Sequence, residues 1–166
     1  MNNILKYLSD LSGDNTYYLT SLNLIKDVNL DYYRTLSSHF SDADLDKLLS
    51  QDNWRLNLVA YTYFLSVEAK EKYCLFQKAL ERESFISPQL VVAIALFAKQ
   101  ETEAYFKELL VNSDISSKTK GAIFAVLPWC SYSKLCLNTL EIEDLSQFNI
   151  GYLTSDTHIR FWKLNR

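Results

Sequence analysis

Apolar segments recur along this chain at a nearly regular interval of about 33 residues, and no other sequence feature constrains the fold as strongly. Ala60, Ala93 and Ala125 occupy matching positions in three of these segments. Leu22–Ile25 precedes the similar run Leu56–Val59 by almost the same interval. A period in this range is typical of helix–turn–helix units repeated along an axis.

A second series of short segments falls between the members of the first. These segments recur at a similar but slightly shorter interval, and they are Lys47–Leu49, Lys78–Leu80, Glu108–Leu110 and Asn138–Leu140. Members of the first series, such as Leu90–Ala98, are apolar on almost every side, which is typical of a buried helix. Members of the second series have one apolar face only. The sequence therefore predicts a buried layer beside a half-exposed layer.

The scarcity of turn-forming residues agrees with an all-helical chain. Only three Gly and two Pro occur in 166 residues, too few for the many tight turns of a β-sandwich or of a nucleotide-binding α/β fold. We predict a single all-α domain, an α-solenoid-like stack of about four antiparallel helix pairs with an insertion at 29–40. The predicted pairs cover 17–50, 53–83, 87–112 and 116–140, followed by an irregular C-terminal cap at 141–166.

Capping residues mark the predicted helix boundaries. Side chains of Ser, Asp and Asn bind the exposed N–H groups at helix starts, and Pro is favoured at the first helical position. The predicted caps are Ser41 with Asp44, Asp52 or Asn53, Ser87 before Pro88, and Ser116 or Ser117. Pro128 is predicted to end its helix, because it lacks an N–H group.

The period and the two layers resemble those of HEAT-like and armadillo-like helical repeat proteins over residues 17–140. Such a resemblance implies a binding scaffold. A few members of this class act on DNA through aromatic and acidic residues on a basic concave surface, and Trp54-Arg55 is similar to that pattern. The resemblance therefore also implies an alternative, a protein that acts on nucleic acid.

The chain contains little that predicts catalysis or metal binding. Neither His39 nor His158 has a His or Cys partner at ligand spacing, and the three Cys residues are predicted to be reduced thiols. We expect His39 in a surface loop and His158 near the start of a short terminal helix. Asp42–Asp46 superficially resembles a calcium loop, but Lys47 and Asn53 stand where Gly and Glu are needed. We predict no catalytic residues, no cofactor and no metal.

Charge favours a basic partner over nucleic acid. The net charge is −3, and residues 1–52 contain eight acidic and four basic side chains. Nucleic-acid binding usually requires a basic face, because phosphate contacts dominate its affinity. No signal peptide and no apolar run long enough for a bilayer is apparent in the sequence, so we expect a cytoplasmic protein that binds no membrane.

Acidic residues open three of the predicted second helices and would line up in a stack. The candidates are Asp42, Asp44, Asp46, Glu68, Glu71, Glu101 and Glu103. Acids in a first helical turn are also explained by the helix dipole alone, so both interpretations stay open. Tyr32, Tyr33 and Trp54 are further candidates, because Tyr and Trp are enriched at protein interfaces, although packing in the core also explains them.

The sequence therefore predicts a non-catalytic protein-binding module. Its most specific form is an immunity or inhibitor protein, of the kind found in bacteria, that neutralises a basic partner such as a secreted nuclease toxin. Acidic surfaces steer basic partners and raise association rates. Two alternatives remain, a structural or adaptor subunit of an assembly and the HEAT-like protein that acts on nucleic acid.

Overall fold

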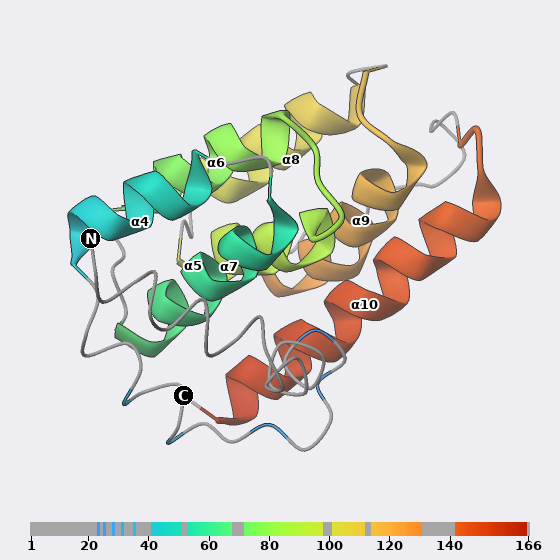
Figure 1. Ribbon diagram of the computed structural model, residues 1–166. Helices are drawn as coiled ribbons and strands as arrows, with labels where there is room; N and C mark the ends of the chain where they lie inside the picture. Colours follow the sequence, from blue (N-terminus) through green and yellow to red (C-terminus); the bar gives the residue numbers. More distant parts are fainter. Residues whose placement is uncertain are drawn as a thin grey trace. The chain divides into compact units, whose positions relative to one another are not determined.

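A computed structural model describes most of the C-terminal three quarters of the chain. The described ranges are 41–50, 53–67, 72–97, 101–111, 114–130 and 142–165, with isolated positions at 23, 25, 28, 31 and 35. Every described element is an α-helix, which confirms the all-α class (Figure 1). The chain divides into two compact units, unit 1 at Met1–Leu75 and unit 2 at Phe76–Arg166, and each is described by itself.

Unit 1 contains two described helices that pack together, α4 (Asp42–Leu49) and α5 (Trp54–Val67). The predicted caps at both starts are confirmed. Ser41 donates from its backbone N–H and its hydroxyl to Asp44, at 3.0 and 2.7 Å. The side-chain oxygen of Asn53 accepts from the backbone N–H of Arg55 at 3.0 Å. These bonds satisfy groups that helix starts leave exposed.

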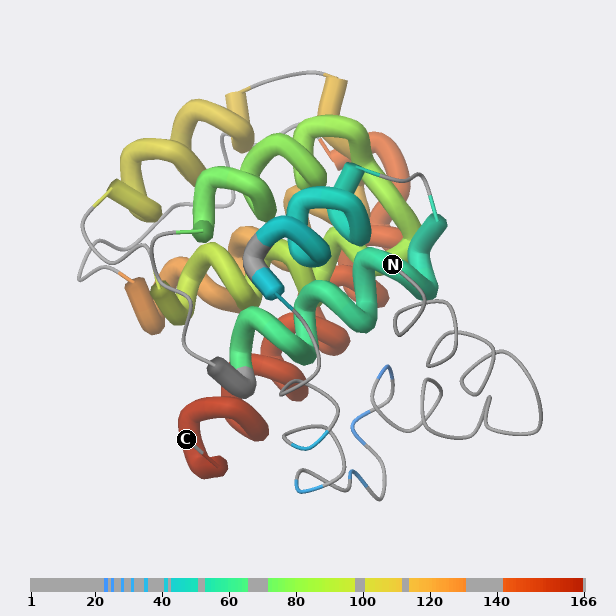
Figure 2. The backbone as a smooth tube through the Cα atoms, turned by 60° about the vertical axis from the view of Figure 1, so that its left-hand side comes forward, coloured from blue at the N-terminus to red at the C-terminus, as the bar shows by residue number. Residues whose placement is uncertain are grey.

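Unit 2 is built in three layers of helices (Figures 1 and 2). Its helices are α6 (Tyr73–Glu81), which begins three residues before the unit boundary, α7 (Ser87–Phe97), α8 (Glu101–Val111), α9 (Ser117–Cys130) and α10 (Leu145–Leu164). Both views show α7 and α9 in the middle layer, between α6 with α8 on one side and α10 on the other. Helix α10 packs on α9 and α7.

The layers explain which helices are apolar on every side. Ten of the eleven residues of α7 are buried, as the middle layer requires. The outer helices α6 and α8 bury one face each, with Phe76 and Phe106 both fully enclosed. The sequence prediction of a buried helix series and an amphipathic series is confirmed for these elements.

Two glycines set the distance between α9 and α10. A Cβ atom at Gly121 would lie 2.0 Å from the backbone oxygen of Phe148, and one at Gly151 would lie 1.8 Å from that of Lys118. Backbone atoms cannot yield as a flexible side chain can, so only glycine allows this approach. The same interface holds a tilted ring pair, Phe124 with Phe148, whose centroids lie 5.7 Å apart.

The C-terminal segment corrects the sequence prediction. We expected an irregular cap at 141–166, but residues 145–164 form α10, the longest described helix at 20 residues. Asp144 begins it, because its carboxylate accepts the backbone N–H groups of Ser146 and Gln147 at 2.9 and 3.1 Å. His158, expected near the start of a short helix, is buried in the second half of this long one.

Two helix boundaries also differ from the prediction. Pro128 does not end α9, which continues to Cys130, because proline lacks an N–H group but its fixed φ angle is compatible with a helix. Ser87 is already helical, and its hydroxyl exchanges hydrogen bonds with the backbone of Ser84 one turn earlier. The start of α9 agrees with expectation, since the Ser116 hydroxyl oxygen accepts the Thr119 N–H at 3.2 Å.

Candidate protein-binding site

The acids predicted to bind a partner lie in both units, and one of them, Asp44, forms part of a helix cap. Asp44 is bound to Ser41 in the cap of α4, and the Ser41 hydroxyl is the main reason that the pKa of Asp44 is lowered. Asp46 is exposed on the same helix, which also contains Asp42. A carboxylate that caps a helix still presents its charge to a partner, so the two interpretations of these acids are compatible.

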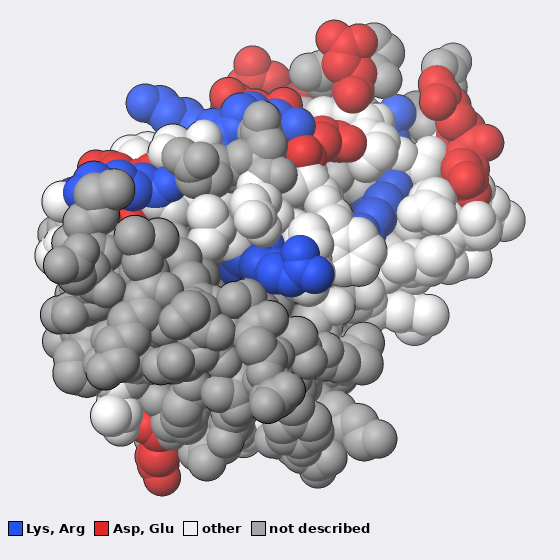
Figure 3. Space-filling model, in the orientation of Figure 1, with Lys and Arg blue, Asp and Glu red and all other residues white. Residues whose placement is uncertain are grey.

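Helix α8 carries the second described group of acids. Glu101 is exposed at its start, and Glu103 forms an ion pair with Lys107 one turn later, at 2.5 Å. Acidic and basic side chains are interleaved on the surface over α6 and α8 (Figure 3). The acids of α4 and α8 belong to different units, so the continuous acidic ridge through them stays a prediction.

Four of the predicted binding residues lie outside the described residues. They are Tyr32, Tyr33, Glu68 and Glu71. Trp54 is described: it is half-buried at the start of α5, and the guanidinium of Arg55 lies 4.6 Å from its ring centre. This local cation–π contact explains why Trp54 and Arg55 lie close together, and no ligand is needed to explain it.

The most distinctive surface of unit 2 lies on α10, which the sequence prediction missed. One face of α10 is buried against α9 and α7 through Phe148, Gly151, Ser155, His158, Ile159 and Trp162. Ser155 fixes that contact, because its buried hydroxyl donates to the Pro88 oxygen of α7 at 2.9 Å. A helix that is apolar on one face needs no further apolar residues elsewhere.

The opposite side of α10 nevertheless carries a second apolar row. We name it the α10 stripe, and it consists of Ile150, Leu153, Phe161 and Leu164, with the polar Thr157 among them; Phe161 is half-buried. Intervals of three and four residues keep such a row on one side of a helix. Leu153 is 64% exposed and Leu164 is 84% exposed, while Ile150 is 47% exposed. The Thr157 hydroxyl donates to the Leu153 oxygen at 2.8 Å and so binds its own helix.

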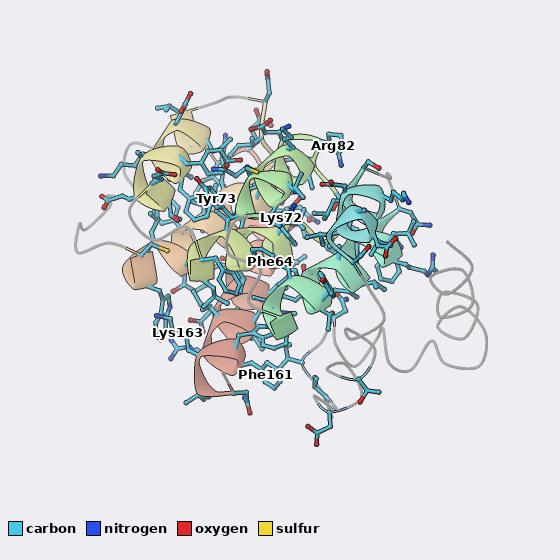
Figure 4. The ribbon with its side chains drawn as sticks, turned by 90° about the vertical axis from the view of Figure 1, so that its left-hand side faces the viewer. Phe64, Lys72, Tyr73, Arg82, Phe161 and Lys163 are labelled. Atoms are coloured by element: carbon cyan, nitrogen blue, oxygen red, sulfur yellow. The ribbon has the colours of Figure 1, made fainter. Side chains whose placement is uncertain are left out.

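A basic edge borders the stripe along the second half of α10. It consists of Arg160, Lys163 and Trp129 of α9. The Trp129 ring lies 4.8 Å from the Lys163 ammonium and 5.5 Å from the Arg160 guanidinium. Figure 4 shows Lys163 and Phe161 leaving α10 on opposite sides, Lys163 toward the end of α9. The Trp129 side chain remains 38% exposed beneath both cations.

One carboxylate belongs to the basic edge. Asp156 accepts two hydrogen bonds from Arg160 Nε, at 2.9 and 2.8 Å, and this bond is the main reason that the pKa of Arg160 is raised. Arg160 is exposed, Asp156 is partly exposed, and the two are one helical turn apart, so the pair orders the guanidinium more than it stabilises the fold. With Lys163 included, the edge has a net charge of about +1.

Cys130 follows Trp129 but has the properties of a structural thiol. Its pKa is raised to about 11, chiefly by burial; Lys163 lowers the pKa and Glu103 raises it by smaller amounts. The thiol donates to the Ala95 oxygen at 3.7 Å. A thiol with a raised pKa is a poor nucleophile near neutral pH, because the thiolate is the reactive form.

Comparison of the chain with protein-family models, curated proteins and solved structures gave no significant match. Among the residues that the structure describes, no three His, Cys, Asp or Glu side chains are grouped to hold a metal ion. Within the same part of the chain, no helix is both long and apolar enough to cross a bilayer. The α10 surface therefore has to be interpreted from its own geometry and chemistry.

Proposed function

We propose that this chain is a non-catalytic protein-binding module and that the α10 stripe is its binding surface. The observation that carries the proposal is the exposure of Ile150, Leu153 and Leu164 on one side of α10, while the opposite side of the same helix is buried. Contiguous exposed apolar residues bordered by polar ones mark interaction sites, since each costs free energy in water.

The composition around the stripe supports the proposal. Interfaces are enriched in Trp, Tyr and Arg, and their centres are apolar. Trp129, Tyr152 and Arg160 are all partly or largely exposed beside the stripe. Burying an exposed Leu contributes roughly 1.5–3 kcal/mol, so Leu153 and Leu164 together would supply a substantial part of a moderate affinity.

We further propose that the helices form a HEAT-like stack of antiparallel pairs. Contacts at one repeat period support this arrangement within unit 2. The Glu83 carboxylate accepts the Ser116 N–H at 2.8 Å, and the Lys118 ammonium donates to the Phe85 oxygen at 2.5 Å, both across 33 residues. Equivalent residues of successive pairs are neighbours in such stacks.

The narrower form of the proposal is an inhibitor or immunity protein for a basic partner such as a secreted nuclease toxin. The charge of residues 1–75 supports it, because they contain ten acidic and seven basic side chains, against ten of each in residues 76–166. A basic region of the partner would bind these acids, and a different segment of the partner would bind the α10 stripe. Co-expression with a toxin encoded beside the gene tests this form. Loss of toxicity is expected, and unchanged toxicity with no complex formed would reject it.

The binding proposal itself is tested by site-specific cross-linking. A photoreactive amino acid replaces Leu153 on the α10 stripe, and in a control variant it replaces Lys78, which is exposed on α6. We expect one protein to cross-link at position 153 and not at 78, and expect the purified pair to bind. The substitution Leu164→Asp should abolish that binding. A partner that binds the Leu164→Asp variant equally well would place the binding site elsewhere.

A further inference from the structure

The surface of α10 also restricts the chemistry of its partner. Resting on the proposed function, we infer that the partner presents an amphipathic helix with acidic residues along one edge of its apolar face. The α10 stripe runs from Ile150 to Leu164, a length of about 21 Å at the rise of an α-helix. A straight apolar row at intervals of three and four residues packs against the matching row of a second helix.

The two borders of the stripe differ in charge, and this difference identifies the acidic edge. On one border lie Arg160 and Lys163 with the exposed ring of Trp129, and Asp156 pairs with Arg160, so this border has a net charge of about +1. On the other border, Gln147, Thr154 and Asn165 carry no charge. Acids are therefore favoured on only one edge of the incoming helix. They lie opposite the second half of α10, because both cations lie there.

Charge complementarity disfavours a second copy of this chain as the occupant. When two α10 stripes overlap fully in antiparallel order, Thr157 lies opposite Thr157 of the other copy. Lys163 then lies opposite Gly151 and gains no acid, while Arg160 keeps Asp156 of its own helix. The exposed acids before α10, Glu143 and Asp144, lie beyond the overlap. A cation that loses water without gaining a counter-charge weakens an interface.

Two synthetic peptides test the inference on the full-length chain. Both are amphipathic helices with the same apolar face, one with Glu and the other with Lys at the same positions along one edge. Binding is measured by fluorescence anisotropy at two salt concentrations. We expect the Glu peptide to bind about tenfold more tightly at low salt, and the advantage to shrink as salt screens it.

Matched variants assign the effect to the α10 surface. Arg160→Glu with Lys163→Glu should reverse the preference between the peptides, and Leu153→Asp should abolish binding of both. The control is Lys78→Glu with Arg82→Glu, which makes the same change of charge on exposed positions of α6 and should keep the original preference. Far-UV circular dichroism confirms that each variant is folded.

The possible failures are distinguishable. Equal binding of both peptides, tighter binding of the Lys peptide, or binding of neither would overturn the inference. It would also be overturned if the partner segment cross-linked at position 153 proved basic or non-helical, although the proposed function would then stand. A rise in molar mass of the chain alone by light scattering, abolished by Leu153→Asp, would instead assign the stripe to a second copy. Absence of any partner cross-linked at position 153 would count against the proposed function.

Discussion

Helices α7 and α10 both carry apolar residues on more than one side, but their surroundings differ. Helix α7 lies in the middle layer of unit 2, and neighbouring helices cover nearly all of its surface. Helix α10 lies in an outer layer, so one apolar face is covered and the α10 stripe is not. Nearly all of the apolar surface of α7 is buried by packing within the fold. Part of the apolar surface of α10 is not buried by the fold and remains exposed.

The comparison separates two uses of the same residue types. In α7, the apolar side chains are buried inside the protein, so they stabilise the fold and are not available to bind a partner. In the α10 stripe, they add little to the fold and would stabilise a complex. Substitutions in α7 should therefore lower the free energy of unfolding, whereas substitutions on the α10 stripe should weaken binding and leave the free energy of unfolding almost unchanged.

The largest expected effect is in α7. Ile94 is fully buried, so Ile94→Ala removes apolar contacts and leaves a cavity that costs about 2–5 kcal/mol in the free energy of unfolding. Urea unfolding followed by circular dichroism measures it. Ile150→Ala on the stripe is the matched control and should cost less than about 1 kcal/mol. Equal losses at the two positions would remove the distinction between the helices.

A smaller loss of unfolding free energy is expected for a substitution where α10 crosses α9. Gly151→Ala would gain up to about 1 kcal/mol of helix propensity on an open surface. Here its Cβ meets the Lys118 oxygen, so the helices must separate, at a net cost of about 1–3 kcal/mol. Thr157→Ala on the exposed side is the control and should be close to neutral. An increase in unfolding free energy for Gly151→Ala would contradict the close approach.

This crossing shows what the sequence could and could not predict. Helices α5, α7 and α9 were predicted, because each contains an apolar run recurring at the repeat period. The interface of Gly121 with Gly151 was missed, since no local pattern reports that two backbones distant in sequence come close in space. With its apolar residues spread over two faces among Ser, Thr and Asn, α10 resembled an irregular segment.

The candidate site was harder to predict than the helices for a related reason. Capping residues such as Ser41, Asn53 and Ser116 act within their own turn, so the sequence identified them correctly. Exposure of Leu153 depends instead on which helices cover α10, and that is a property of the tertiary fold. The contact of Trp129 with Lys163 likewise joins two helices whose pairing the sequence did not reveal.

The start of α10 should respond to pH. Hydrogen bonds, led by the one with Ser146, lower the pKa of Asp144 below its ordinary value of 3.8. A carboxylate with a lowered folded pKa stabilises the fold above its unfolded pKa, and that stability is lost as pH falls through the folded pKa.

A capping residue that does not titrate isolates the pH-dependent part of the stability that Asp144 contributes. Asparagine caps helices nearly as well as aspartate but does not titrate. The wild type should therefore lose more thermal stability between about pH 5 and pH 2 than Asp144→Asn does, in melting curves followed by circular dichroism. Glu108→Gln, which removes an exposed carboxylate of α8, is the control. Identical pH profiles for the wild type and Asp144→Asn would show that the cap adds nothing to the stability of α10.

The smallest effect on stability is expected on the α10 stripe itself. Leu153→Ser exchanges a side chain that is mostly in water in the folded protein, so the unfolding free energy should change by no more than about 0.5 kcal/mol. The same substitution should clearly reduce the binding of an apolar fluorescent dye to the native protein, because the dye requires exposed apolar surface. A loss of more than about 1 kcal/mol would mean that Leu153 is covered by its own chain. The stripe would then be part of the core, as α7 is, and no surface would remain there for a partner.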